Sequence, residues 1–174
     1  HDPANSSKVV DENGEPLVVY HGAHSKQNFF IFEYRGDSYG FHFGTKQAAQ
    51  DRLKDLSAEM FYEGNPRILE VFLSIKNPIK LKDYSEREYR NAEESGKDGV
   101  MYENEVEDEG SISYAVFSSN QIKLADGTNT TFDSENPNIR FDGGGGVNEN
   151  FTPIFQWRMM GIEQEDGTYK YVPY

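Results

Sequence analysis

The sequence predicts a β-rich α+β protein, and three observations carry that prediction. Aromatic residues make up 14% of the 174 residues, which suits packed sheets better than a helical bundle. Short apolar runs are bounded by glycine, proline, asparagine and aspartate, as strands and their turns are. One longer stretch has apolar residues three and four apart, the pattern of an amphipathic helix. A chain of this length is most simply one domain with a core of its own.

The first expected element after a disordered leader, residues 1–8, is a hairpin. Asn13-Gly14 supplies the positive φ of a tight turn. Strands are therefore expected over 8–10 and 17–20, followed by a second apolar run at 29–32.

A third strand and a helix are expected next. The aromatic residues of the segment 39–43 share one face of a strand, while His42 points to the other. Thr45 stands where a helix N-cap belongs, its hydroxyl able to accept from a free backbone N–H. The helix itself is predicted from apolar residues at steps of four, three and four: Ala49, Leu53, Leu56 and Met60.

Beyond this helix the pattern changes to a period of two. Apolar and other residues alternate over 69–75, which predicts a strand. The polar stretch 83–95 is helix-prone, and Gly96 suits the C′ position after it. Two further strands are expected over 98–102 and 112–117, on either side of an acidic loop.

The expected organisation is therefore a domain with a tail. The domain spans 9–142, four glycines at 143–146 form a flexible linker, and 147–174 form a C-terminal hairpin tail.

Composition excludes several functional classes. The chain has no cysteine, so it holds neither disulfides nor a Cys-ligated metal. A net charge of −13 argues against broad nucleic-acid binding, because phosphates are repelled before contact. No apolar run approaches the ~18 residues that a membrane span requires. No histidine and carboxylate set has standard metal-ligand spacing, so no metal site is expected.

Three motifs stand in a fixed order: Val-Val-Tyr-His-Gly at 18–22, Gly-Phe-His-Phe-Gly-Thr at 40–45 and Ser-Tyr-Ala-Val-Phe at 113–117. With them the chain resembles ADP-ribosyltransferases of the diphtheria-toxin/PARP-like branch, most closely the domains embedded in phage and mobile-element polyvalent proteins. The resemblance covers about residues 8–142. Its further segments are 8–17, 77–78, 98–100, 119–123 and 136–141.

The resemblance implies a split β-sandwich, with a few helices around an NAD cleft between two small antiparallel sheets. It also implies a reaction in which NAD⁺ loses nicotinamide and ADP-ribose passes to an acceptor. The transition state is an oxocarbenium-like sugar, so catalysis is chiefly positioning and charge stabilisation. NAD is the co-substrate, no metal is implied, and the macromolecular acceptor, protein or nucleic acid, is not identified.

By match to the family motifs, His21 binds the adenosine ribose and the backbone of Gly22 meets the nicotinamide amide. His42 takes the place of a tyrosine that stacks on nicotinamide, and Arg52 is the nearest equivalent of a second stacking residue. The expected cofactor-binding residues are Tyr20, His21, Gly22, His42, Phe43, Thr45 and Arg52.

The expected catalytic residues are His21, His42 and Ser113, and the last departs from the family pattern. Many members carry glutamate there, gripping the ribose hydroxyl and supporting the positive charge. Loss of one preorganised electrostatic group costs about 3–4 kcal/mol. The sequence leaves open a substituting loop carboxylate (Glu105, Glu107 or Glu109), a carboxylate of the substrate, an inactive enzyme, and a deliberate inactivating mutation.

Two alternatives to an active transferase stay open. One is a disabled module of the same fold that binds NAD or a protein partner without turnover. The other is a nuclease in which His21 and His42 act as general acid and base. The mobile-element resemblance also implies a toxin-like effector acting in a bacterial cytoplasm.

Overall fold

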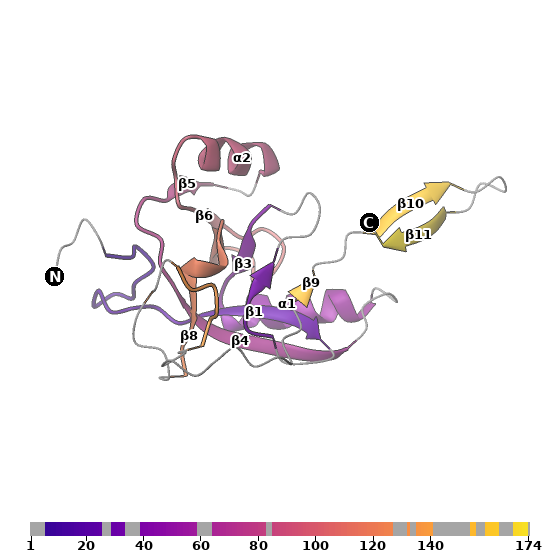
Figure 1. Cartoon of the computed structure of the whole chain (residues 1–174), viewed down its shortest axis with the longest axis horizontal. Coiled ribbons are helices and arrows are strands. Elements are labelled where there is room, and N and C mark those ends of the chain that lie inside the picture. Colours follow the sequence, from indigo (N-terminus) through magenta and orange to yellow (C-terminus); the bar gives the residue numbers. More distant parts are fainter. Residues whose placement is uncertain are drawn as a thin grey trace.

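The computed structural model (Figure 1) describes residues 6–25, 29–33, 39–58, 64–82, 85–126, 132, 135–140, 154–155, 159–163 and 169–173. These residues form an α+β fold with sheets and two α-helices, as the sequence predicts. No helix among them is both long enough and apolar enough to cross a membrane. The strands are β1 Val19–Ser25, β2 Phe32–Glu33, β3 Phe41–Phe43, β4 Asn65–Leu73, β5 Ile79–Leu81, β6 Gly99–Glu103, β7 Ile112–Val116, β8 Ile122–Leu124, β9 Ile154–Phe155, β10 Met159–Glu163 and β11 Tyr169–Pro173, and the helices are α1 Lys46–Ala58, α2 Glu86–Glu94 and the 3₁₀ turn η1 Ser119–Gln121.

The first sheet has the order β1-β4-β8 and is antiparallel throughout. His21 of β1 lies opposite Leu69 of β4. Figure 1 shows α1 lying along β1 and β4. The period-two pattern that predicted a strand is confirmed, since Val71 and Leu73 are buried and Glu70 is exposed. The strand starts earlier than its apolar pattern, at Asn65.

The second sheet has the order β3-β7-β6-β5, and it corrects one expectation. We expected two antiparallel sheets, but β5 and β6 run parallel. The reason is their connection: α2 lies between them in the chain, and a crossover through a helix returns the chain in the same direction. Figure 1 shows α2 beside β5 and β6, at the far side of the domain from α1.

Among the described residues, one isolated backbone bridge joins the two sheets. The N–H of Tyr20 in β1 donates to the carbonyl of Gly44 at 2.9 Å, and the N–H of Gly44 donates back at 3.0 Å. Gly44 directly follows β3, so this pair fixes the end of β3 against the start of β1.

The core has two parts, one on each side of β3. Phe41 and Phe43 are buried in the larger cluster, which fills the space between the sheets. His42 points the other way, toward the smaller cluster around Tyr89 of α2. The alternation predicted for this strand is therefore confirmed.

Both ends of the domain have more structure than the sequence suggests. Ser7, assigned to the leader, donates its hydroxyl to the carbonyl of Leu73 at 2.6 Å, so the folded part begins before Val9. In the tail, β10 and β11 form the expected antiparallel hairpin, and β9 pairs in parallel with β2. The glycine run 143–146 lies outside the described residues.

Lys123 of β8 is a charged residue inside the fold, only 3% exposed. Its ammonium donates to the carbonyls of Asn136 at 2.9 Å and Asn138 at 2.8 Å. The segment 136–140 is thereby attached to the first sheet. A buried cation is tolerated because it has these hydrogen-bond partners.

We predict that Lys123→Met destabilises the protein by about 2–3 kcal/mol, because two partly buried carbonyls lose their charged donor. Urea denaturation measures the change. Lys80→Met, at an exposed position of β5, is the matched control. Equal unfolding free energies in the two variants would show that the buried ammonium does not hold this segment.

Candidate functional site

His21 lies in the middle of β1, beside the bridge between the sheets. Its ring is partly buried and packs against Phe32 and Phe43, at centroid distances of 5.1 and 5.4 Å. Its Nδ1 lies 2.8 Å from the backbone carbonyl of His42. The ring is therefore held by both sheets at once.

This hydrogen bond sets the protonation of His21. A carbonyl only accepts, so Nδ1 carries the hydrogen and Nε2 is left with a lone pair in the neutral ring. Burial lowers the pKa of His21, and the positive charge of Arg52 adds to the lowering, although the bond to the His42 carbonyl opposes it. His21 is thus a neutral imidazole whose Nε2 can accept a hydrogen bond from a hydroxyl.

Gly22 allows a close approach, but in this structure the approaching group is protein. A Cβ placed on Gly22 would lie 2.4 Å from the carbonyl oxygen of Ala49 in α1. Tyr20, on the same side of β1, carries the Lys46 ammonium over its ring at 5.9 Å. This side of β1 is therefore packed against α1, whereas His21 is on the opposite side.

His42 is held at both ring nitrogens. Nε2 donates to the carbonyl of Tyr39 at 2.9 Å, so Nδ1 accepts from the hydroxyl of Tyr102 at 3.0 Å. The ring also stacks on Tyr89 with centroids 6.4 Å apart. Burial, then the charges of His21 and Arg52, lower the pKa of His42 from 6.5 to about 4. A ring engaged in this way has no nitrogen available to exchange a proton with a substrate, which argues against the two-histidine nuclease.

Ser113 is only 2% exposed, at the start of β7. The side-chain amide of Asn104 donates to its hydroxyl at 2.9 Å. Gly44 lies so close that a Cβ there would be 2.9 Å from the Ser113 oxygen. Ser113 therefore sits at the junction of the sheets, but it presents a neutral hydroxyl already engaged with Asn104.

Three other predicted residues surround this junction. Thr45 caps α1, because its hydroxyl oxygen accepts from the Ala48 N–H at 3.0 Å, as the sequence predicts. Phe43 is buried beneath His21. Arg52 is an exposed residue of α1 whose charge lowers the pKa of both histidines.

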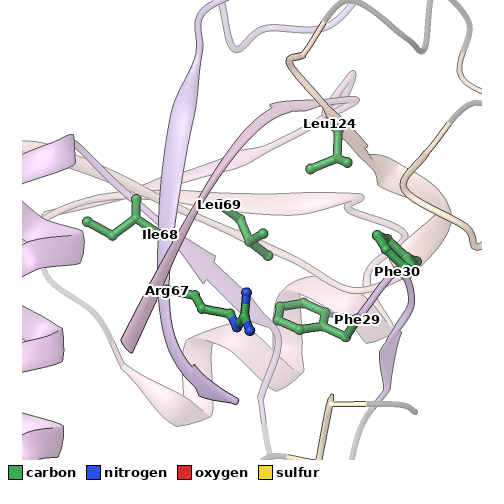
Figure 2. A pocket seen from close by; sticks show the side chains of 6 residues that line it. All are labelled: Phe29, Phe30, Arg67, Ile68, Leu69 and Leu124. Carbon is green, nitrogen blue, oxygen red and sulfur yellow. The ribbon is translucent and has the colours of Figure 1, made fainter. Parts of the chain in front are cut away.

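A pocket of about 250 Å³ opens on the first sheet (Figure 2), and none of the predicted site residues is among those that line it. Arg67 and Leu69 of β4 line it, and they lie opposite Ala23 and His21 in the register of the first sheet. Paired residues share a face of a sheet, so the pocket is on the His21 face. Figure 2 shows the Arg67 guanidinium pointing toward a phenylalanine ring. The other lining residues are Phe29, Phe30, Ile68 and Leu124.

The described residues contain no group of three or more histidines and carboxylates arranged to hold a metal ion.

The geometry can be compared with known proteins. A sequence model of the family described as ADP-ribosyltransferase in polyvalent proteins matches residues 11–95. The similarity to that family supports an ADP-ribosyltransferase domain in this part of the chain. The matched segment includes His21 and His42 and ends before Ser113. No curated protein and no solved structure matches the chain.

The fold brings most of the predicted site residues to one junction, but it divides them between faces. Ser113 and Thr45 adjoin Gly44, and His21 contacts the backbone of His42. The side chains of His21 and His42 lie in different core clusters. Whether these residues bind NAD stays a prediction.

Two residues at this junction were not found from the sequence. Asn104 is 5% exposed although it begins an acidic loop, and Asp108 accepts a hydrogen bond from the Thr45 hydroxyl. The one available signal was the polar Asn104 directly after an apolar strand, a position where a side chain can order a turn.

The neutral state of His42 predicts a pH dependence of stability. Its folded pKa of about 4 lies below the ordinary 6.5, so between these pH values the unfolded chain binds a proton that the folded chain excludes. His42 therefore contributes stability above pH ~6.5 that is lost as the pH falls toward ~4, up to about 3 kcal/mol.

Urea denaturation between these pH values measures this dependence. We expect His42→Gln to flatten it, since an amide keeps a donor for Tyr39 and does not titrate. An unchanged dependence in that variant would contradict a His42 held neutral in the fold.

Proposed function

We propose that this domain is an NAD⁺-dependent ADP-ribosyltransferase. The observation that carries the proposal is the state of His21, a neutral ring with an acceptor nitrogen on the face that borders an open pocket. A ribose hydroxyl is a suitable donor for that nitrogen. The family match supports this assignment of the ligand.

In the proposed reaction, the bond between C1′ of the nicotinamide ribose and the pyridinium nitrogen breaks. Nicotinamide leaves with the electron pair and becomes neutral, and the sugar carries the positive charge. A nucleophile of the acceptor then bonds to C1′ and releases its proton to solvent. The protein's contribution is to align the sugar and to stabilise the transient charge.

The pocket of about 250 Å³ is a suitable place for one end of NAD⁺. It is smaller than the ~300–1,000 Å³ typical of whole-ligand sites, so it would hold a part of the molecule. Phe29 and Phe30 offer aromatic surface for a base, and Arg67 offers a cation for a phosphate. Because the protein carries a net charge of −13, a local cation is important for holding an anion. We place the adenosine end there, next to His21.

A second candidate is favoured by Ser113. The position that usually holds glutamate has a buried hydroxyl engaged with Asn104, and it brings no negative charge. On this alternative, the domain binds NAD⁺ or a protein partner without turning NAD⁺ over. For either candidate, we propose a role as a mobile-element or phage effector, toxin-like and acting in a bacterial host cytoplasm, by analogy with the polyvalent-protein family.

We predict that His21→Ala loses NAD⁺ binding and nicotinamide release while the fold is retained. Binding is measured by NAD⁺-dependent thermal stabilisation, and release by chromatography of the free base. His24→Ala is the matched control, a histidine in the same strand on the opposite face. It should keep both properties.

The outcomes separate the candidates. Nicotinamide release that depends on His21 supports the transferase. Stabilisation without release supports the binding module. Neither response in the wild-type protein, or an equal response in His21→Ala, would contradict both.

A further inference from the structure

The loop between β6 and β7 has a defined structure at the junction of the two sheets. Asn104 organises it, with its side-chain oxygen accepting from the N–H groups of Val106 and Glu107 at 2.9 Å each. The N–H of Gly110 donates to the Asn104 carbonyl at 2.8 Å and closes the loop. Because the amide of Asn104 also donates to Ser113, the loop is fixed to the residue at the predicted catalytic corner.

Asp108 is the loop residue that faces this corner. Its carboxylate accepts from the hydroxyl of Thr45. Its backbone N–H donates to the carboxylate of Asp51 in α1, and its carbonyl accepts from Ser111 at 3.0 Å. Asp108 is therefore held in place by contacts of both its side chain and its backbone.

The backbone of Asp108 is unusual as well. Its φ of +51° is the only positive value for a non-glycine residue in the described ranges. Left-handed backbone costs energy in residues with a Cβ, although aspartate tolerates it better than most. Such conformations concentrate at functional sites, where the surrounding structure enforces them.

The contacts of Thr45 bring this carboxylate toward Ser113. Thr45 directly follows Gly44, and Gly44 lies against the Ser113 oxygen and pairs with Tyr20. Asp108 thus contacts the residue next to Gly44, and Gly44 is the residue that lies against Ser113. The neighbouring residues Glu105 and Glu109 are exposed. The backbone N–H of Glu107 donates to the side-chain oxygen of Asn104.

We propose that Asp108 supplies the negative charge that Ser113 lacks, and that it supports the positive sugar formed when nicotinamide leaves. This inference rests on the proposed function. The carboxylate acts electrostatically: it forms no covalent bond, and it exchanges no proton. Nicotinamide takes the electron pair of the broken C–N bond, and the acceptor closes the new bond to C1′.

The test compares charge-neutral variants of one loop. We expect Asp108→Asn to lower kcat for nicotinamide release about 10²–10³-fold, the usual effect of removing one preorganised electrostatic group. KM for NAD⁺ and NAD⁺-dependent thermal stabilisation should change little. Glu105→Gln and Glu109→Gln remove the same charge from exposed positions of the loop and should keep wild-type kcat.

Two further variants separate charge from loop structure. Asp108→Gly suits the positive φ, so it should keep the loop and the melting temperature and lose kcat as Asp108→Asn does. Asp108→Glu retains the charge and should recover part of kcat.

The result that overturns the inference is wild-type release that persists in Asp108→Asn and Asp108→Gly. A kcat loss in Asp108→Asn that Asp108→Gly does not share, or that the Glu105 and Glu109 variants share equally, would also overturn it. Absence of release in the wild-type protein would remove the proposed transferase along with this inference, whereas the preceding outcomes leave the transferase standing.

Discussion

The rest of the site depends on how two small sheets are joined at Tyr20 and His21. One backbone bridge, between Tyr20 and Gly44, and one side-chain bond, from His21 to the His42 carbonyl, connect them. The first brings Gly44 against the Ser113 hydroxyl. The bond to the His42 carbonyl requires the ring hydrogen on Nδ1 and leaves Nε2 as an acceptor. A single junction therefore sets both the position of the strands and the chemical state of the histidine.

Charge at the junction is distributed in an unexpected way. The two histidines are neutral because burial lowers the pKa of each, and the charge of Arg52 adds to the lowering. Ser113 is neutral, and the carboxylate comes from Asp108, in a loop that Asn104 and Thr45 hold in place. A chemistry that needs negative charge at this junction is thereby compatible with the neutral Ser113 in β7. A loop can supply a functional group when its backbone is as well fixed as a strand.

Local patterns predicted much of this fold, and contacts between distant segments account for what they missed. Alternation placed His42 opposite the phenylalanines of β3, and the Thr45 cap was evident from residue type alone. The parallel pairing of β5 with β6 was missed because the three-residue strand β5 was not predicted, although the helix between the two strands was. The sequence pointed to the neighbouring glutamates and not to Asp108, because residue type alone does not reveal that this aspartate has a left-handed backbone. Gly22 was assigned to ligand approach, and only the docked helix reveals its contact with Ala49.

We propose that His21 is a neutral imidazole whose Nε2 accepts a hydrogen bond from NAD⁺. Nitrogen NMR of isotope-labelled histidine, with His21→Ala to assign the signals, reports the state of this ring. We expect that at neutral pH the His21 ring is protonated at Nδ1 alone, and that the Nε2 signal shifts when NAD⁺ is added. A doubly protonated ring, a hydrogen on Nε2, or a spectrum that NAD⁺ leaves unchanged would contradict it.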